Sequence, residues 1–78
     1  MKDEIGQENY RKLLYYFENK IWVHFKDLDN IFYNGLILNL NEEKLTLVLG
    51  ERMMGEIPFL LENINTDSIS KFKEREGK

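Results

Sequence analysis

The chain has 78 residues, no cysteine, one histidine and a formal net charge of −3 at pH 7. These values exclude disulfides and thiolate metal sites, and they argue against a protein that holds nucleic acid by bulk attraction to phosphate. A chain this short buries only roughly 60% of the surface that its unfolded form exposes. We therefore expect a single domain over residues 1–78 that relies on close packing or on self-association for its stability.

The same composition bears on the class of function. The chain starts with an acidic segment that lacks the apolar core of a signal peptide, and no apolar run approaches the ~20 residues of a membrane-spanning helix. The one histidine, His24, has no evident nucleophile or carboxylate partner, and residues 50–55 lack the ending of a phosphate-binding loop. We predict a cytoplasmic protein that is not an enzyme, with no membrane partner, no cofactor and no metal site.

A helix is predicted over residues 5–19. Its apolar residues recur at spacings of three and four, which places them on one stripe, and most of its charged residues fall on the other side. The stripe consists of Tyr10, Leu13, Leu14, Phe17 and Ile21. We expect it to cover the open end of a sheet. Tyr15 and Tyr16 flank the stripe and are candidates for contact with a protein partner.

Residues 21–26 alternate between the two faces of a predicted strand. Val23 and Phe25 are expected on its buried face. The opposite face carries Trp22, His24 and Lys26. Aromatic side chains outside the core are candidates for stacking on nucleic-acid bases, although packing is their more common role. The candidates of this kind are Trp22, Tyr33, Tyr15 and Tyr16.

A longer strand is predicted over residues 31–40, after a polar turn, with Gly35 inside it. Glycine weakens a strand unless it permits a bend or the close approach of another backbone. A strand that curls around a small barrel needs such a point, so we expect the bend at Gly35. The consecutive apolar residues Leu36, Ile37 and Leu38 indicate burial on both faces of this strand.

The rest of the chain predicts three more short strands. A hairpin turn at residues 41–44 leads to a strand at 45–49, and a glycine-bounded loop at 50–55 leads to a fourth strand. Pro58 cannot donate a ladder hydrogen bond, so we expect it at an edge position or at the start of a strand. A single turn of tight helix follows at residues 60–64.

The last strand is expected to begin at Thr66, with Ile69 and Phe72 facing inward, and residues 74–78 form a charged tail. The fold class is therefore mostly β. It consists of an N-terminal helix and a five-stranded, strongly bent antiparallel small barrel over about residues 21–73.

This order of elements resembles the Sm-like family of small barrels. In that family, alternating apolar residues precede a glycine, an apolar residue lies two positions later, and an aspartate lies six positions after the glycine. The matching residues here are Val23, Phe25, Gly35, Ile37 and Leu40. Asn41 stands in the place of the aspartate, and the family's adjacent arginine and glycine are missing, since Arg52 and Gly55 are separated by two methionines.

The resemblance implies an RNA-binding site and self-association. By position, the RNA-binding candidates are Asn41, Lys44, Thr46 and Arg52. Sm-like subunits pair strand four of one copy with strand five of the next, which corresponds to residues 56–61 and 67–73 here. The departures at Asn41 and Arg52 weaken the case for the family's uridine pocket. A homo-oligomer that binds RNA is therefore one expectation.

The alternative is a protein-interaction or regulatory module without nucleic-acid binding, because Src-homology-type barrels with the same layout bind proteins. Two adjacent methionines, Met53 and Met54, lie in the predicted loop before the fourth strand. Methionine adapts well to partner surfaces. Together with Tyr15 and Tyr16, they are the candidate contacts for a protein partner.

Overall fold

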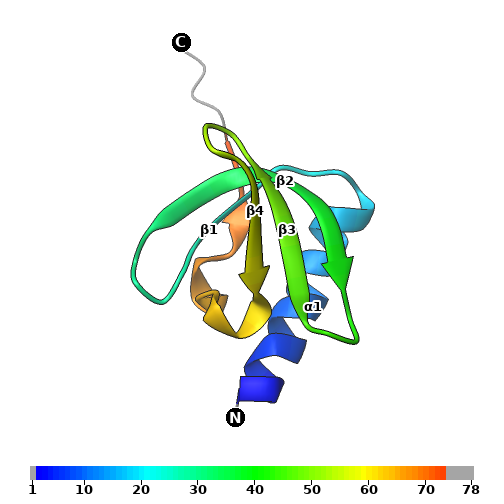
Figure 1. Ribbon diagram of the computed structural model, residues 1–78. Helices are drawn as coiled ribbons and strands as arrows, with labels where there is room; N and C mark the ends of the chain where they lie inside the picture. The colour runs from blue at the N-terminus through cyan, green and yellow to red at the C-terminus, as the bar shows by residue number, and fades with distance from the viewer. Residues whose placement is uncertain (1, 74–78) are drawn as a thin grey trace.

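The computed structural model describes residues 2–73, which form one α-helix and one antiparallel sheet of five strands (Figure 1). The elements are α1 (Lys2–Glu18), β1 (Val23–Lys26), β2 (Phe32–Asn41), β3 (Thr46–Glu51), β4 (Gly55–Leu60), the 3₁₀ turns η1 (Leu61–Asn63) and η2 (Thr66–Ser68), and β5 (Ser70–Lys71). The fold is mostly β with an N-terminal helix, as predicted. The charged tail expected at residues 74–78 lies outside the described residues.

The helix α1 begins earlier than residue 5 and ends in a left-handed residue. Lys20 has φ +54°, and the N–H of Ile21 donates to the carbonyl of Tyr16 at 3.0 Å. The Lys20 N–H donates to Phe17 at 3.3 Å, which completes a C-terminal motif that satisfies carbonyls the helix leaves free. The chain therefore turns sharply after α1 and enters β1 at Val23.

The buried side of α1 differs in part from the predicted stripe. Leu13 is fully buried, as expected, but Gly6 and Asn9 are the other buried positions. The Asn9 side chain donates to the carbonyls of Leu61 (2.7 Å) and Ile64 (2.9 Å) and accepts from the Thr66 hydroxyl (2.6 Å). A buried polar group is stable when its hydrogen bonds are satisfied. These partners come from the far end of the sequence, so the helical spacing alone does not reveal Asn9.

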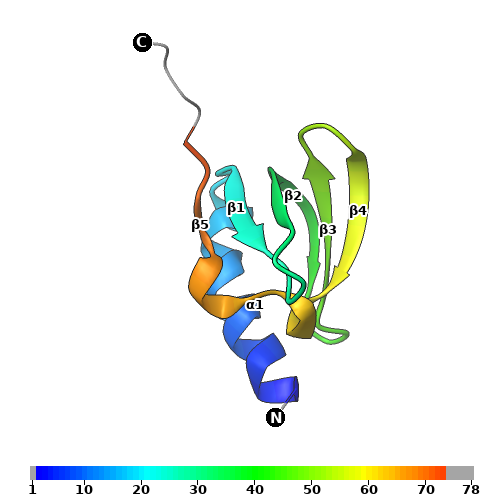
Figure 2. The same ribbon diagram turned by 90° about the vertical axis from the view of Figure 1, so that its left-hand side faces the viewer.

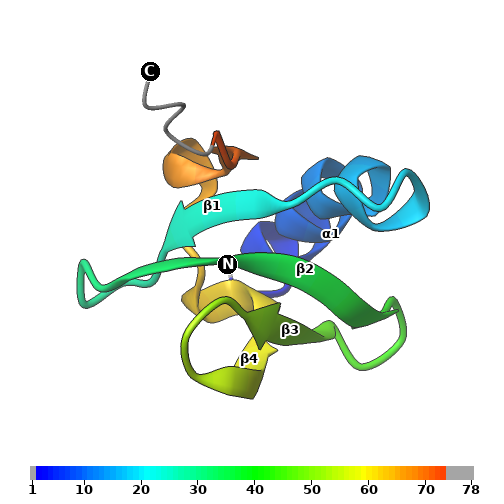
Figure 3. The same ribbon diagram turned by 90° about the horizontal axis from the view of Figure 1, so that it is seen from above.

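The strand order is β4-β3-β2-β1-β5, so β4 and β5 are the two edges of the sheet. The connection through η1 and η2 runs between these edges, and α1 packs against η1 and β2 (Figure 2). In the view from above, β2 is curved and lies between α1 on one side and β3 and β4 on the other (Figure 3). The five-stranded antiparallel sheet is therefore present, but it stays open between β4 and β5 rather than closing into a barrel.

Gly35 lies where β2 changes partners, opposite Val23 of β1 and Glu51 of β3. A Cβ atom at this position would lie 2.3 Å from the Gly50 carbonyl oxygen and 2.9 Å from the Glu51 Cα. No side chain fits at such a distance, so the close approach of β2 to β3 at this position requires glycine. Of the two roles that a glycine in a strand allows, a bend or a close backbone approach, the contacts at Gly35 show the close approach.

The apolar run after Gly35 is not buried on both faces. Ile37 is buried, while a register shift between Ile37 and Asn39 turns Leu38 outward, where it lies over Gly50. A bulge of this kind adds a residue to one strand and sharpens its bend. The expectation of burial on both faces was wrong, because the bulge directs Leu38 into solvent instead of into a second packed layer.

The core lies between the inner face of the sheet, α1 and the η1 segment. Its fully or almost fully buried members are Leu13, Val23, Phe25, Ile37, Leu47, Leu49, Leu61 and Ile64. Tyr33 and Phe59 pack against it, with ring centroids 4.9 Å apart in an edge-to-face arrangement. Burial, together with the nearby Asp27 carboxylate that accepts from the Tyr33 hydroxyl at 3.4 Å, raises the pKa of Tyr33 above its ordinary value. Tyr33 is thus part of the packing and not a stacking platform.

Three local predictions need correction. The loop expected at residues 50–55 is a tighter turn, because β3 continues to Glu51 and β4 starts at Gly55. Thr66 begins η2 instead of a strand. Phe72 does not face the core but packs against Trp22, with ring centroids 6.0 Å apart. The edge position of Pro58 and the tight turn at η1 are confirmed.

Candidate functional site

The four RNA-binding candidates do not form one site. Asn41 and Thr46 face each other at the turn between β2 and β3, and the Asn41 side chain accepts from the Lys44 N–H at 2.8 Å. Arg52 follows the other end of β3, which is six residues long and therefore spans roughly 20 Å. The two turns lie at opposite ends of the sheet in Figure 1. Arg52 therefore has to be considered apart from the other three.

The protein-interaction candidates are separated as well. Tyr15 is exposed near the end of α1, while Tyr16 is half-buried and packs against the core. Met53 and Met54 occupy the turn between β3 and β4 with 83% and 60% of their surface exposed. Met53 and Met54 thus directly follow Arg52, so this one turn carries both an RNA-binding candidate and two protein-interaction candidates.

This turn is held by a buried carboxylate. Glu51 is 8% exposed, and one of its oxygens accepts from the N–H groups of Met53 (2.7 Å) and Met54 (3.0 Å). The other oxygen accepts from the Asn34 N–H at 3.2 Å. Burial works to raise the pKa of Glu51, but these backbone donors and the neighbouring Arg52 outweigh it and hold the pKa below its ordinary value. A charged Glu51 therefore fixes the backbone from which Arg52 extends.

Arg52 reaches toward an aromatic pair on the face of the sheet that points away from the core, which we term the outer face. Its guanidinium carbon lies 5.5 Å from the centroid of the Phe72 ring, and Phe72 packs on Trp22 with an angle of 36° between the planes. The Phe72 N–H donates to the Trp22 carbonyl at 2.9 Å, which fixes the two residues side by side. Trp22 remains 41% exposed.

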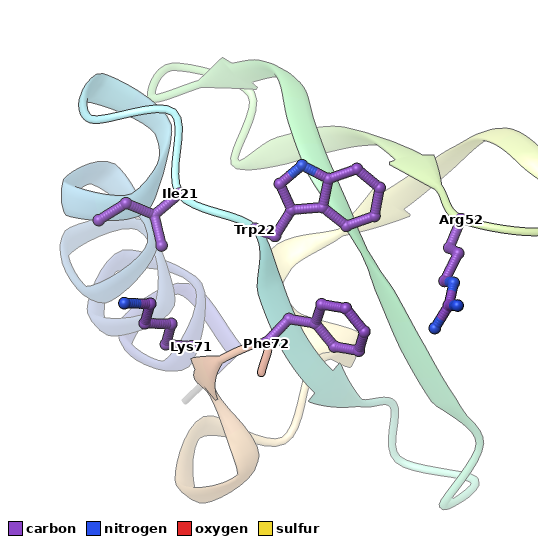
Figure 4. Close-up of a pocket in the computed structure, with 5 residues that line it drawn as sticks. All are labelled: Ile21, Trp22, Arg52, Lys71 and Phe72. Carbon is purple, nitrogen blue, oxygen red and sulfur yellow. The ribbon is translucent and has the colours of Figure 1, made fainter. Parts of the chain in front are cut away.

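A cavity of about 420 Å³ lies at this place, and we term it the aromatic groove. Its lining residues are Ile21, Trp22, Arg52, Lys71 and Phe72. Figure 4 shows the two rings and Arg52 on one side of β1, with the side chains of Ile21 and Lys71 on the other. Two aromatic faces with an arginine beside them can hold a flat, electron-rich group that carries negative charge.

The outer face continues along β1 and β2 with further aromatic and cationic groups. The His24 and Phe32 rings stack with centroids 5.0 Å apart and 13° between their planes, and the Lys26 ammonium lies 5.8 Å from the Phe32 centroid. His24 Nδ1 is hydrogen-bonded to the Asn34 side-chain oxygen. The alternation of residues 21–26 predicted that Trp22, His24 and Lys26 share a face. The register of β1 confirms this for His24 and Lys26, while Trp22 lies immediately before β1.

Sequence reasoning missed Phe72 and Phe32 as members of this surface. We expected Phe72 to face inward with Ile69, but side chains three positions apart in an extended segment point to opposite faces. Ile69 packs against the core, and Phe72 packs on Trp22 instead. Phe32 begins β2 opposite Lys26, which only the strand register reveals. The one signal for this surface in the sequence was the alternation of residues 21–26, which placed three of its members on the face away from the core.

Over residues 2–73 the structure contains no group of three or more histidine, aspartate or glutamate side chains placed to hold a metal ion. In the same part of the chain, no helix has the length and apolar character needed to cross a membrane. Comparison of the sequence and structure with protein-family models, curated proteins and solved structures gave no match.

Proposed function

We propose that this chain is a small β domain that binds single-stranded nucleic acid, such as RNA, through the aromatic groove. The observation that carries the proposal is the exposed Trp22 ring packed on the half-buried Phe72, with the Arg52 guanidinium carbon 5.5 Å from the Phe72 ring centroid. Base stacking on aromatic side chains tolerates any base, because every base has a π face, and arginine adds a cation–π contribution. This binding requires no catalytic group.

The net charge of −3 is compatible with this role because the site needs few phosphate contacts. Arg52 and Lys26 lie on the outer face and Lys71 lines the groove. With two to three phosphates neutralised, the logarithm of the binding constant should fall with the logarithm of the salt concentration with a slope of roughly −1.4 to −2.1. Stacking would then supply most of the affinity at physiological salt.

Trp22 is the only tryptophan, so its fluorescence reports on the groove alone. We expect short oligouridylate, oligoadenylate and oligothymidylate to quench this fluorescence at low salt, and the RNA and DNA arms to show whether the 2′-hydroxyl matters. Arg52→Ala should weaken binding about fivefold. Lys44→Ala removes the same charge at the other end of β3 and serves as the matched control, with less than a twofold effect.

Each negative result of these binding experiments would contradict a different part of the proposal. No quenching by any oligonucleotide at low salt would contradict nucleic-acid binding at this groove, since low salt strengthens phosphate contacts. A larger loss in Lys44→Ala than in Arg52→Ala would move the site to the turn between β2 and β3, with Asn41 and Thr46, as the family resemblance implies. Unfolding measurements on both variants would show whether the altered proteins remain folded.

A protein partner is the second candidate, favoured by the exposure of Met53 and Met54 beside Arg52. In that case a nuclease-treated extract should still yield a partner with the wild-type chain. Replacement of both methionines by serine should abolish the capture and leave fluorescence quenching by oligonucleotides unchanged.

Self-association is part of the proposal because β4 and β5 are both edges of an open sheet. Edge strands present unpaired backbone groups that can pair with another chain. The candidate segments, residues 56–61 and 67–73, include Pro58, which removes one donor from β4, and η2, which leaves β5 with two residues. Light scattering coupled to size exclusion tests this, and a single species of monomer mass at high concentration would contradict it.

A further inference from the structure

The outer face carries a second aromatic and cationic group that the proposed groove does not use. Phe32 is 56% exposed, stacks on His24 and has the Lys26 ammonium 5.8 Å from its ring centroid. Next to it lies a cavity of about 290 Å³, which we term the Phe32 groove. Its lining residues are Lys26, Phe32, Asn65, Asp67 and Ser68.

The two grooves are aligned along one strand. Trp22 lies immediately before β1, and Lys26 ends β1 and pairs with Phe32. Four residues of strand correspond to roughly 13 Å. His24 lies between them, and its hydrogen bond to Asn34 keeps this imidazole on the outer face against Phe32. One extended ligand can therefore contact both aromatic positions without turning.

We infer that the outer face binds two unstacked bases of one single strand, the first at Trp22 and Phe72 and the second at Phe32. This inference rests on the proposed function. In a duplex the bases are stacked at ~3.4 Å per step, so each base face is covered by its neighbours and cannot stack on an aromatic side chain. A single strand with splayed bases can, which is the form that aromatic platforms recognise. The face therefore selects single strands and excludes duplexes.

The charges on this face agree with such a path. Arg52 and Lys26 lie at its two ends, where each can meet a phosphate next to a stacked base. Asp67 lines the Phe32 groove on the side away from β2, and its carboxylate disfavours a phosphate there. The base, rather than the backbone, is thus the part of the nucleotide that occupies the Phe32 groove.

The test is the dependence of binding on ligand length, read from Trp22 fluorescence with oligouridylates from mononucleotide to hexanucleotide. For the wild type we expect a gain in affinity of about tenfold once the ligand is long enough to reach Phe32. Phe32→Ala should remove this gain and leave the affinity for the mononucleotide unchanged. A self-complementary duplex should bind more weakly than the single strand of the same length.

Two further variants separate stacking from folding. Phe32→Leu keeps an apolar side chain at this position but lacks a π face, so it should behave as Phe32→Ala, whereas Phe32→Tyr should restore the length dependence. Leu38→Ala, at another exposed apolar position of β2, is the matched control and should have no effect. Affinity that does not rise with length, or a Phe32→Leu protein that equals the wild type, overturns the second subsite while Trp22 quenching still supports the first. Absence of quenching at every length overturns both.

Discussion

The two hairpin turns at the ends of β3 are closed by the same device, a side-chain oxygen that accepts backbone N–H groups, but they differ in its charge and burial. At the turn between β2 and β3, the neutral and half-buried Asn41 amide accepts one N–H. At the turn between β3 and β4, the buried Glu51 carboxylate accepts three. The first turn leaves Lys44 in solvent, while the second positions Arg52 against Phe72. Both backbones are held by hydrogen bonds, but only the second turn brings its cation against an aromatic ring.

The largest difference in stability between the two turns should come from replacing the glycine next to each turn by alanine. Gly35→Ala would place its Cβ 2.3 Å from a backbone oxygen that cannot move independently, so we expect destabilisation on the order of 3 kcal/mol or loss of folding. Gly6→Ala, beside the other turn, would meet only the Leu45 side chain at 3.1 Å and would gain helix propensity. Its net effect should stay within about 1 kcal/mol. Urea unfolding of both variants measures the contrast, and equal effects would contradict it.

Removal of each accepting oxygen should give the next largest effect. Glu51→Ala leaves three partly buried backbone donors without their acceptor and should cost about 3 kcal/mol. Asn41→Ala removes one partly exposed hydrogen bond and should cost about 0.5–1 kcal/mol. Chemical denaturation gives both values. Similar losses of unfolding free energy for the two variants would show that the burial of Glu51 does not determine the stability of the turn between β3 and β4.

The charge on Glu51 predicts a pH dependence that Asn41 cannot produce. Because the folded protein holds the pKa of Glu51 below its ordinary value of 4.5, the unfolded chain takes up the proton first as the pH falls. The stabilising contribution is therefore complete above pH 4.5 and is lost as the pH falls through the folded pKa. Wild type and Glu51→Gln should converge in unfolding free energy below that range, while Asn41→Ala should run parallel to the wild type. If the two unfolding free energies already converged above pH 4.5, a lowered pKa of Glu51 in the folded protein would be refuted.

The smallest effects on stability are expected from the two cations. Lys44→Ala should change the unfolding free energy by less than about 0.5 kcal/mol because Lys44 is exposed. Arg52→Ala should cost about 0.5–1 kcal/mol through the lost contact with Phe72. Thermal unfolding of the pair checks this. A loss in Arg52→Ala well above this range would mean that its binding defect reflects unfolding.

The sequence predicted those parts of the fold that depend on local pattern. The alternation of β1, the close approach at Gly35 and the edge position of Pro58 follow from chain geometry, and all three agree with the structure. The open gap between β4 and β5 could not be predicted, because it depends on how far the sheet bends. The buried Asn9 was missed since its partners lie more than fifty positions away.

The candidate site was harder to predict than the fold. Trp22 was identified as outward-facing from the alternation of β1, and Arg52 was named for a different site. What joins them is Phe72, whose direction is set by the short β5 and by the backbone hydrogen bond to Trp22. Residues that meet across a sheet edge carry no shared periodicity, so only the strand register brings them together.

The amide of Asn9 has a consequence for the order in which the molecule assembles. All three of its contacts join the first helix to residues 61–66, so the helix cannot be locked in place until the last third of the chain has taken its shape. Contacts between distant positions form late, because the intervening loop must close first. We expect Asn9→Ala to accelerate unfolding with little change in the refolding rate, which stopped-flow kinetics would reveal. The helix would thus be the last element to settle.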